Sequence, residues 1–169
     1  MKKSYVLGWL VSGMLATCQV QAETLAKPEG RVILTVTGNI EHTNTAEKTA
    51  QFDRAMLMKL DVVDLKTPTP WSEGIDEYRG PLLRSLLEAV GASSNTLSVT
   101  ALNDYSAVVP VEDSKKYNVM LAMDVNGKPM TVRKKGPLFL LYPFSEDASL
   151  NNEVIHNRSV WQIKSIRVE

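Results

Sequence analysis

The pattern of apolar and polar positions predicts many short strands and few helices. Runs that are rich in β-branched residues, or that alternate between apolar and polar side chains, are typical of strands. They cover residues 31–37 and 62–65 in the first half of the chain, and residues 96–101, 107–111, 118–123, 130–132, 137–142 and 163–168 in the second half. Asn126-Gly127 predicts a hairpin turn. Residues 67–71 are expected to be extended, because each proline moves the residue before it out of the helical region.

Helical periodicity is limited to short segments. An apolar face recurs around residues 53–59, and a clearer helix is expected from Pro81 to Gly91, with Pro81 at its first position and Gly91 as its C-terminal cap. Its apolar stripe, assigned to the core, consists of Leu82, Leu83, Leu86, Leu87 and Val90. No helical crossovers separate the strands, and no linker or repeat divides the chain. The expected fold class is therefore α+β, mainly β, with one domain over residues 31–169.

The beginning of the chain has the features of a secretion signal. Lys2-Lys3 precede an apolar run over residues 5–16, and Val20-Gln21-Ala22 provide small residues before Glu23. We expect a cleaved signal peptide over residues 1–22, followed by a flexible leader over residues 23–30. Two alternatives are an uncleaved N-terminal anchor and a lipoprotein attached through Cys18.

Composition narrows the range of chemistry. The 169 residues include 19 Lys and Arg and 19 Asp and Glu, and removal of the signal takes away Lys2 and Lys3. The mature chain then lacks the basic excess that nucleic-acid binding requires, so nucleic acid is not an expected partner. Cys18 is the single cysteine, so a chain cleaved after Ala22 has neither a disulfide nor a cysteine-based metal site.

The usual catalytic motifs are missing from the sequence. It has no HExxH, GxSxG, P-loop or GxGxxG motif, and its two histidines, His42 and His156, are too few for a typical zinc site. Aromatic and polar residues in turn-like places form the candidate binding set, because a flat ligand needs an apolar face and a few fixed donors and acceptors. The set is Trp71, Arg79, Asn103, Asp104, Tyr105, Tyr142, Arg158, Ser159 and Trp161. Core packing is the alternative for Tyr142 and Trp161, and a simple turn is the alternative for Asn103-Asp104.

An ordered series of motifs resembles a known family. The series runs through Gly80-Pro81-Leu82-Leu83, Leu102-Asn103-Asp104-Tyr105, Val109-Pro110, Asn126-Gly127-Lys128-Pro129-Met130, Gly136-Pro137-Leu138, Tyr142-Pro143 and Trp161-Gln162-Ile163. Over residues 31–168 the chain resembles the molybdopterin-binding domain of the sulfite oxidase superfamily. The resemblance implies that fold and a molybdenum–pterin cofactor held partly by a cysteine thiolate. Residues 65–80, where that cysteine would lie, contain none, which argues against molybdenum and for a pocket that keeps only the pterin-sized slot.

Within that superfamily the chain is similar to bacterial periplasmic pterin-binding proteins. This likeness implies a periplasmic location, a reduced pterin as ligand, and a partner, the periplasmic region of an inner-membrane diguanylate cyclase/phosphodiesterase. It implies no catalytic residues. Trp161 or Trp71 would stack on the pterin, Asn103 and Asp104 would read its polar edge, and Arg158 would donate to a ring carbonyl or a side-chain hydroxyl. The alternatives are a molybdopterin-dependent oxidoreductase and a ligand-free interaction module. The polar segment 145–157 is a candidate docking loop.

Overall fold

A computed structural model describes residues 25–169. The expected signal peptide, Cys18 and the first two residues of the expected leader lie outside the described residues. Within the described part of the chain, no helix is long and apolar enough to span a membrane.

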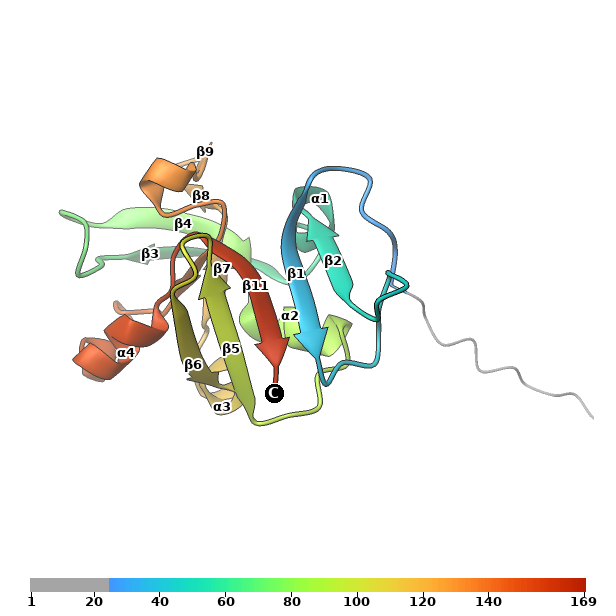
Figure 1. Ribbon diagram of the computed structural model, residues 1–169. Coiled ribbons are helices and arrows are strands. Elements are labelled where there is room, and N and C mark those ends of the chain that lie inside the picture. Colours follow the sequence, from blue (N-terminus) through green and yellow to red (C-terminus); the bar gives the residue numbers. More distant parts are fainter. Residues whose placement is uncertain (1–24) are drawn as a thin grey trace, which may run out of the picture.

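A five-stranded sheet forms the front of the molecule (Figure 1). Its order is β2 (Ala50–Asp53), β1 (Val32–Gly38), β11 (Ile163–Val168), β5 (Thr96–Ala101) and β6 (Ser106–Pro110). β1 and β11 run parallel, and the other neighbours are antiparallel. Two strands from opposite ends of the chain therefore lie side by side in the middle of the sheet.

Two smaller antiparallel units complete the strands. One is a four-stranded sheet in the order β3 (Val62–Thr67), β4 (Asp76–Pro81), β8 (Asp124–Val125) and β9 (Lys128–Pro129). The other is the pair β7 (Met120–Ala122) and β10 (Phe139–Leu141). β4 passes close to β7, because Gly80 leaves room for the Leu121 carbonyl: a Cβ at Gly80 would lie 2.0 Å from that oxygen.

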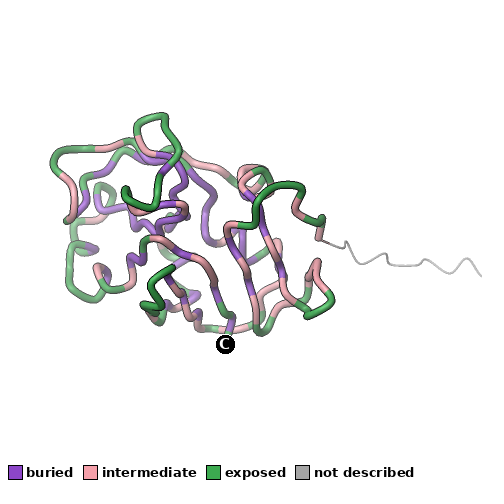
Figure 2. Tube along the Cα trace, turned by 45° about the horizontal axis from the view of Figure 1, so that its top comes forward, coloured by how far each residue is buried: buried purple, intermediate pink, exposed green. Residues whose placement is uncertain are grey.

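Four short α-helices and two 3₁₀ turns connect the strands. They are α1 (Arg54–Leu57), α2 (Leu83–Ala89), α3 (Val111–Lys116), α4 (Glu153–Arg158), η1 (Val132–Lys134) and η2 (Ala148–Leu150). α2 lies behind the five-stranded sheet and buries Leu83, Leu86 and Leu87 in the core. Figure 2 shows the buried chain running through the centre of the molecule and the exposed chain in the outer loops.

The expected fold class is confirmed, and most of the expected strands are present. The hairpin at Asn126-Gly127 is also confirmed, since it joins β8 to β9. The predicted strand over residues 130–132 is wrong, because Thr131 instead accepts backbone bonds from Lys134 and Gly136 and starts η1. The α2 helix begins after Leu82 rather than at Pro81. Pro81 is instead the last residue of β4, where it pairs with Val62 of β3.

Five elements lie where no regular structure was predicted. β2, β4 and α3 were not expected, and the segment predicted as a polar loop over residues 145–157 contains η2 and most of α4. Residues 25–30 of the expected leader contact the domain: Asp53 accepts hydrogen bonds from the Glu29 and Gly30 amides, at 2.9 and 2.7 Å.

Candidate functional site

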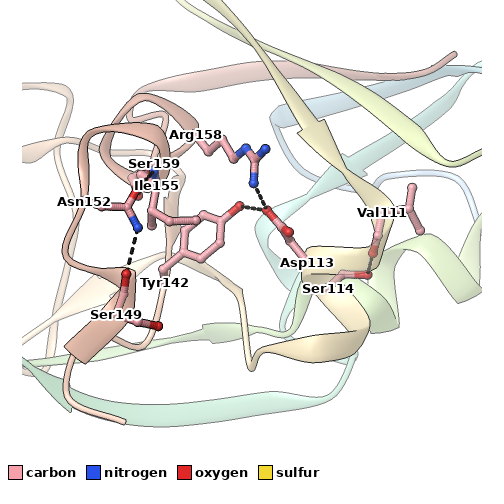
Figure 3. Close-up of polar contacts among 9 residues, drawn as sticks. All are labelled: Val111, Asp113, Ser114, Tyr142, Ser149, Asn152, Ile155, Arg158 and Ser159. Atoms are coloured by element: carbon pink, nitrogen blue, oxygen red, sulfur yellow. Dashed lines mark hydrogen bonds and ion pairs between the residues drawn. The ribbon is translucent and has the colours of Figure 1, made fainter. Parts of the chain in front are cut away.

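A buried carboxylate on α3 forms hydrogen bonds with the core and with the end of α4 (Figure 3). Asp113 on α3 accepts a hydrogen bond of 2.6 Å from the Tyr142 hydroxyl and one of 3.0 Å from Arg158 at the end of α4. Burial raises the pKa of Tyr142 above its ordinary value, and the hydrogen bond to the Asp113 carboxylate raises it further. The network fixes the end of α4, which carries the residues of a neighbouring cleft.

That cleft has a volume of about 390 Å³, which falls within the range of about 300–1,000 Å³ typical of small-molecule sites. It lies between the loop after β3, the β5–β6 turn and the segment from α4 to β11. Its lining residues are Trp71, Asn103, Tyr105, His156, Asn157, Ser159, Val160 and Trp161. Segments distant in the sequence therefore form one concave surface.

Aromatic rings supply the apolar part of the cleft. The Trp71 ring packs edge to face against Trp161 at a centroid distance of 5.4 Å and against His156 at 5.6 Å. Phe139 and Phe144 support Trp71 from the core side. Trp161 leaves 36% of its surface exposed, and the Lys135 ammonium lies 5.3 Å from its ring centroid. An indole that is held at one edge and open to the solvent is suited to stack on a flat ligand.

The β5–β6 turn holds polar groups beside these rings. Asp104 adopts a positive φ of 66° at the tip of the turn, and the Asn103 side chain accepts a hydrogen bond from the Tyr105 amide. The Tyr105 hydroxyl donates to the Asn157 carbonyl across the cleft at 3.1 Å. These bonds fix the turn relative to α4, and Asn103 and Asn157 remain exposed at the rim.

The structure brings together five of the nine residues that the sequence put forward. Trp71, Asn103, Tyr105, Ser159 and Trp161 line the cleft. The Ser159 hydroxyl is occupied, because it donates to the Ile155 carbonyl at 2.8 Å.

The other four sequence candidates do not line this cleft. Arg79 lies on β4 and donates to Asp64 at 2.6 Å. Asp104 points away and pairs with Lys164, whose ammonium holds the pKa of that carboxyl below its ordinary value. Tyr142 is fully buried and Arg158 is paired, both of them on Asp113 behind the cleft.

Three lining residues were absent from the sequence-based set. His156, Asn157 and Val160 come from α4 and the segment after it. The signal was present in the sequence: Asn152 caps the first turn of α4, Glu153 follows it, and Arg158 ends the helix, as expected for the termini of a helix. Because segment 145–157 was interpreted as a polar loop, His156 and Asn157 were not included in the binding set.

A family model described as the oxidoreductase molybdopterin binding domain matches residues 41–146. The match covers more than half of the chain, so this protein belongs to that family. No curated protein matches the chain. The matched region includes Trp71 and the β5–β6 turn but ends before α4 and Trp161.

The donor set of the cleft suits the pterin part of the family's cofactor better than its metal. The described residues contain no group of three or more His, Cys, Asp or Glu side chains that could hold a metal ion. Among the described residues that line the cleft, only His156 carries a side chain of the kind that transition metals prefer, and Trp71 occupies the loop where the family's cysteine would lie. The described lining of the cleft thus offers aromatic rings and side-chain amides and contains no thiolate.

Proposed function

We propose that this protein is a periplasmic pterin-binding signalling protein without catalytic activity of its own. Loaded with a reduced pterin, it engages the periplasmic region of an inner-membrane diguanylate cyclase/phosphodiesterase and modulates cyclic-di-GMP. The observation that carries the binding step is the cleft, in which Trp71 and Trp161 stand beside Asn103 and Asn157 without a thiolate. The compartment and the partner rest on the resemblance of the sequence to periplasmic pterin-binding proteins.

The chemistry of a pterin matches this arrangement. Its rings are flat and apolar on their faces, and its amino-pyrimidine edge presents alternating donors and acceptors. Trp161 offers a face for stacking. The Asn103 side chain offers two N–H donors for the edge, together with the second lone pair of its Oδ1, which already accepts from the Tyr105 amide. Asp113 holds α4, and with it Asn157, in place for this contact.

The first experiment identifies what the protein carries. Protein purified from the periplasm of a pterin-producing bacterium is denatured, and the released small molecules are analysed by fluorescence and mass spectrometry, together with its molybdenum content. A pterin without molybdenum supports the proposal. A near-stoichiometric amount of molybdenum would favour the second candidate, a molybdopterin-dependent oxidoreductase, which family membership supports.

A titration with tetrahydrobiopterin then tests the cleft residues. Asn103→Ala is expected to weaken binding about tenfold, because one unsatisfied hydrogen bond costs on the order of 1.4 kcal/mol. Trp161→Ala is expected to weaken it about tenfold to a hundredfold through the loss of stacking. The matched control is Asp104→Asn, which changes the adjacent residue of the same turn outside the cleft and should leave affinity unchanged.

A ligand-free interaction module gives the opposite result. In that case the purified protein is empty, added reduced pterins do not bind, and Trp161→Ala lowers stability without any separate effect on binding. Equal loss of affinity in Asn103→Ala and Asp104→Asn would argue against the assignment of the pterin edge to Asn103.

Signalling adds one requirement, which is that the loaded and empty proteins differ in affinity for the partner, because a ligand without differential binding shifts no equilibrium. The affinity of each form for the isolated periplasmic region of the cyclase/phosphodiesterase measures this difference. Equal affinities would contradict the signalling step and leave the binding step intact.

A further inference from the structure

The five-stranded sheet opens at one end, between its two parallel strands. β1 and β11 are paired from Thr35 opposite Ser165 to Gly38 opposite Val168, so the first residues of β1 do not pair with the first residues of β11. Each strand also carries a register shift at this level, in β1 between Val32 and Leu34 and in β11 between Ile163 and Ser165. Such bulges bend a strand and end its pairing. Figure 1 shows the two strands close together at their arrowheads and apart at their starts.

A groove of about 340 Å³ lies at this opening. Its floor includes the buried side chains of Leu34 and Ile163. Its rim carries three large apolar side chains that are partly exposed: Val32 at 36%, Leu102 at 46% and Val132 at 50%. Apolar side chains that gather at the rim of a groove are typical of a surface that another molecule covers.

Two basic residues, Arg31 and Lys164, line the groove. Arg133, Lys134 and Lys135, which follow Val132, line a separate pocket beside Asp76 and Tyr78. The acidic groups nearby are already engaged or lie before the strand: Asp104 pairs with Lys164, and Glu29 precedes Gly30. The groove therefore favours an occupant that combines apolar side chains with negative charge.

The groove and the cleft are built from the same two segments. In the β5–β6 turn, Leu102 lines the groove, whereas Asn103 and Tyr105 line the cleft. In the segment leading into β11, Trp161 lines the cleft and Ile163 lines the groove. A ligand that moves either segment on one side must also move it on the other.

We propose that this groove, defined by Val32, Leu102, Val132 and Ile163, is the docking site for an extended acidic and apolar segment of a protein partner. An extended peptide supplies main-chain groups for the edge of β1 that lies before Thr35, apolar side chains for the groove, and carboxylates for Arg31 and Lys164. The identity of the partner as the cyclase/phosphodiesterase rests on the proposed function. The docking chemistry rests on the groove alone.

The test selects decapeptides from a random display library on the purified protein, without pterin, and measures the best binders by fluorescence anisotropy. The expected peptides alternate apolar residues with Asp or Glu. Val132→Glu is expected to weaken their binding about tenfold or more, because it replaces a rim contact by a like charge. The matched control is Val108→Glu on β6, whose valine is 66% exposed and does not line the groove.

Three results would overturn the proposal. The selected peptides could lack acidic enrichment, or Val132→Glu and Val108→Glu could weaken their binding equally. The third result is that no peptide binds, while the protein binds phosphatidylglycerol vesicles and Val132→Glu abolishes that binding. Tetrahydrobiopterin titrations of the same variants keep the two proposals separate. Val132→Glu should bind the pterin like the wild type. If the wild type itself fails to bind the pterin, the proposed function is refuted, and the peptide measurements still test the groove.

Discussion

At the scale of single residues, the Asp113 carboxylate is a buried charge that depends on its partners. Only 8% of the residue is exposed, and it is satisfied by the Tyr142 hydroxyl and the Arg158 guanidinium. A buried carboxylate is tolerated only when such donors remain in place. Residues that the sequence suggested as ligand contacts thus stabilise the wall of the cleft.

Tyr142→Phe should therefore destabilise the protein by about 1.5–3 kcal/mol, the range for a hydrogen bond to a charged group. It should also change the response to alkaline pH. The pKa of Tyr142 is raised in the folded state, so its contribution is fully present below the unfolded value of about 10 and is lost as the pH rises above that value. Urea denaturation between neutral and alkaline pH measures both effects.

Tyr117→Phe provides the control, because it removes the hydroxyl of a half-buried tyrosine whose ring centroid lies 6.4 Å from that of Tyr142. It should cost less at neutral pH. An alkaline loss of stability that is as steep in Tyr142→Phe as in the wild type would contradict the role of this hydroxyl.

The sequence could indicate residue types for the site but could not distinguish lining residues from supporting ones. Asn103 and Asp104 are neighbours in one turn, yet Asn103 lines the cleft whereas Asp104, at a positive φ, pairs with Lys164. Arg158 is chemically suited to a ligand, yet Asp113, which is 45 residues away along the chain, occupies it. Such assignments depend on distant partners that a local pattern does not contain.

At the scale of elements, helices with an apolar face were easier to predict than helices without one. α2 has a complete apolar stripe and was predicted, whereas α3 and α4, each one residue shorter, bury a single apolar side chain each and were missed. The termini of α3 were visible in the sequence, with Glu112 and Asp113 in its first turn and Lys115 and Lys116 in its last. The charges of the first and last turns would therefore have indicated a helix where apolar periodicity could not.

The close approach of β4 and β7 gives a test at this scale. Gly80→Ala places a methyl group 2.0 Å from the backbone oxygen of Leu121, and two backbone segments cannot separate without breaking the packing around them. We expect a loss of about 2–4 kcal/mol in urea denaturation. Gly74→Ala, with no atom within 4 Å of the new methyl group, should cost only about 1 kcal/mol for its positive φ. Equal costs would argue against the close approach.

The start of α1 provides a second test. Asp53 accepts hydrogen bonds from the amides of Met56, Gly30 and Glu29, and these bonds hold its pKa below the ordinary value. Its contribution is therefore present above the unfolded pKa of about 4 and is lost as the pH falls through the lower folded value. Asp53→Asn should lower the melting temperature at neutral pH and flatten its decrease in acid.

Melting curves between pH 7 and pH 2 measure this effect. Asp64→Asn is the control, since Asp64 is an exposed carboxylate that pairs with Arg79. A melting temperature of Asp53→Asn that decreases in acid as steeply as that of the wild type would contradict the assignment.

At the scale of the whole molecule, the family match and the folded unit differ in extent. The match ends at residue 146 and begins after β1, but β1 and β11 form the middle of the sheet, and α4 supplies part of the cleft. The fold therefore requires segments on both sides of the matched region.

A fragment of residues 41–146 should accordingly fail to fold. It lacks the buried Ile163, Ile166 and Val168, each of which contributes about 1.5–3 kcal/mol by burial. Together they approach the total stability of about 5–15 kcal/mol that a domain possesses. Circular dichroism and denaturation of the fragment, compared with residues 25–169, measure this loss. A cooperative transition in the fragment would contradict it.

The parallel pairing of β1 and β11 also determines how the domain responds to mechanical force. A pull between the residues before β1 and those after β11 acts along both strands in opposite directions, since the strands point the same way. The hydrogen bonds between Thr35–Gly38 and Ser165–Val168 are then loaded together in shear, rather than opened one after another as in a hairpin pulled apart from its ends. Tension on the two ends of the domain therefore meets resistance first at the centre of its sheet, beside the groove.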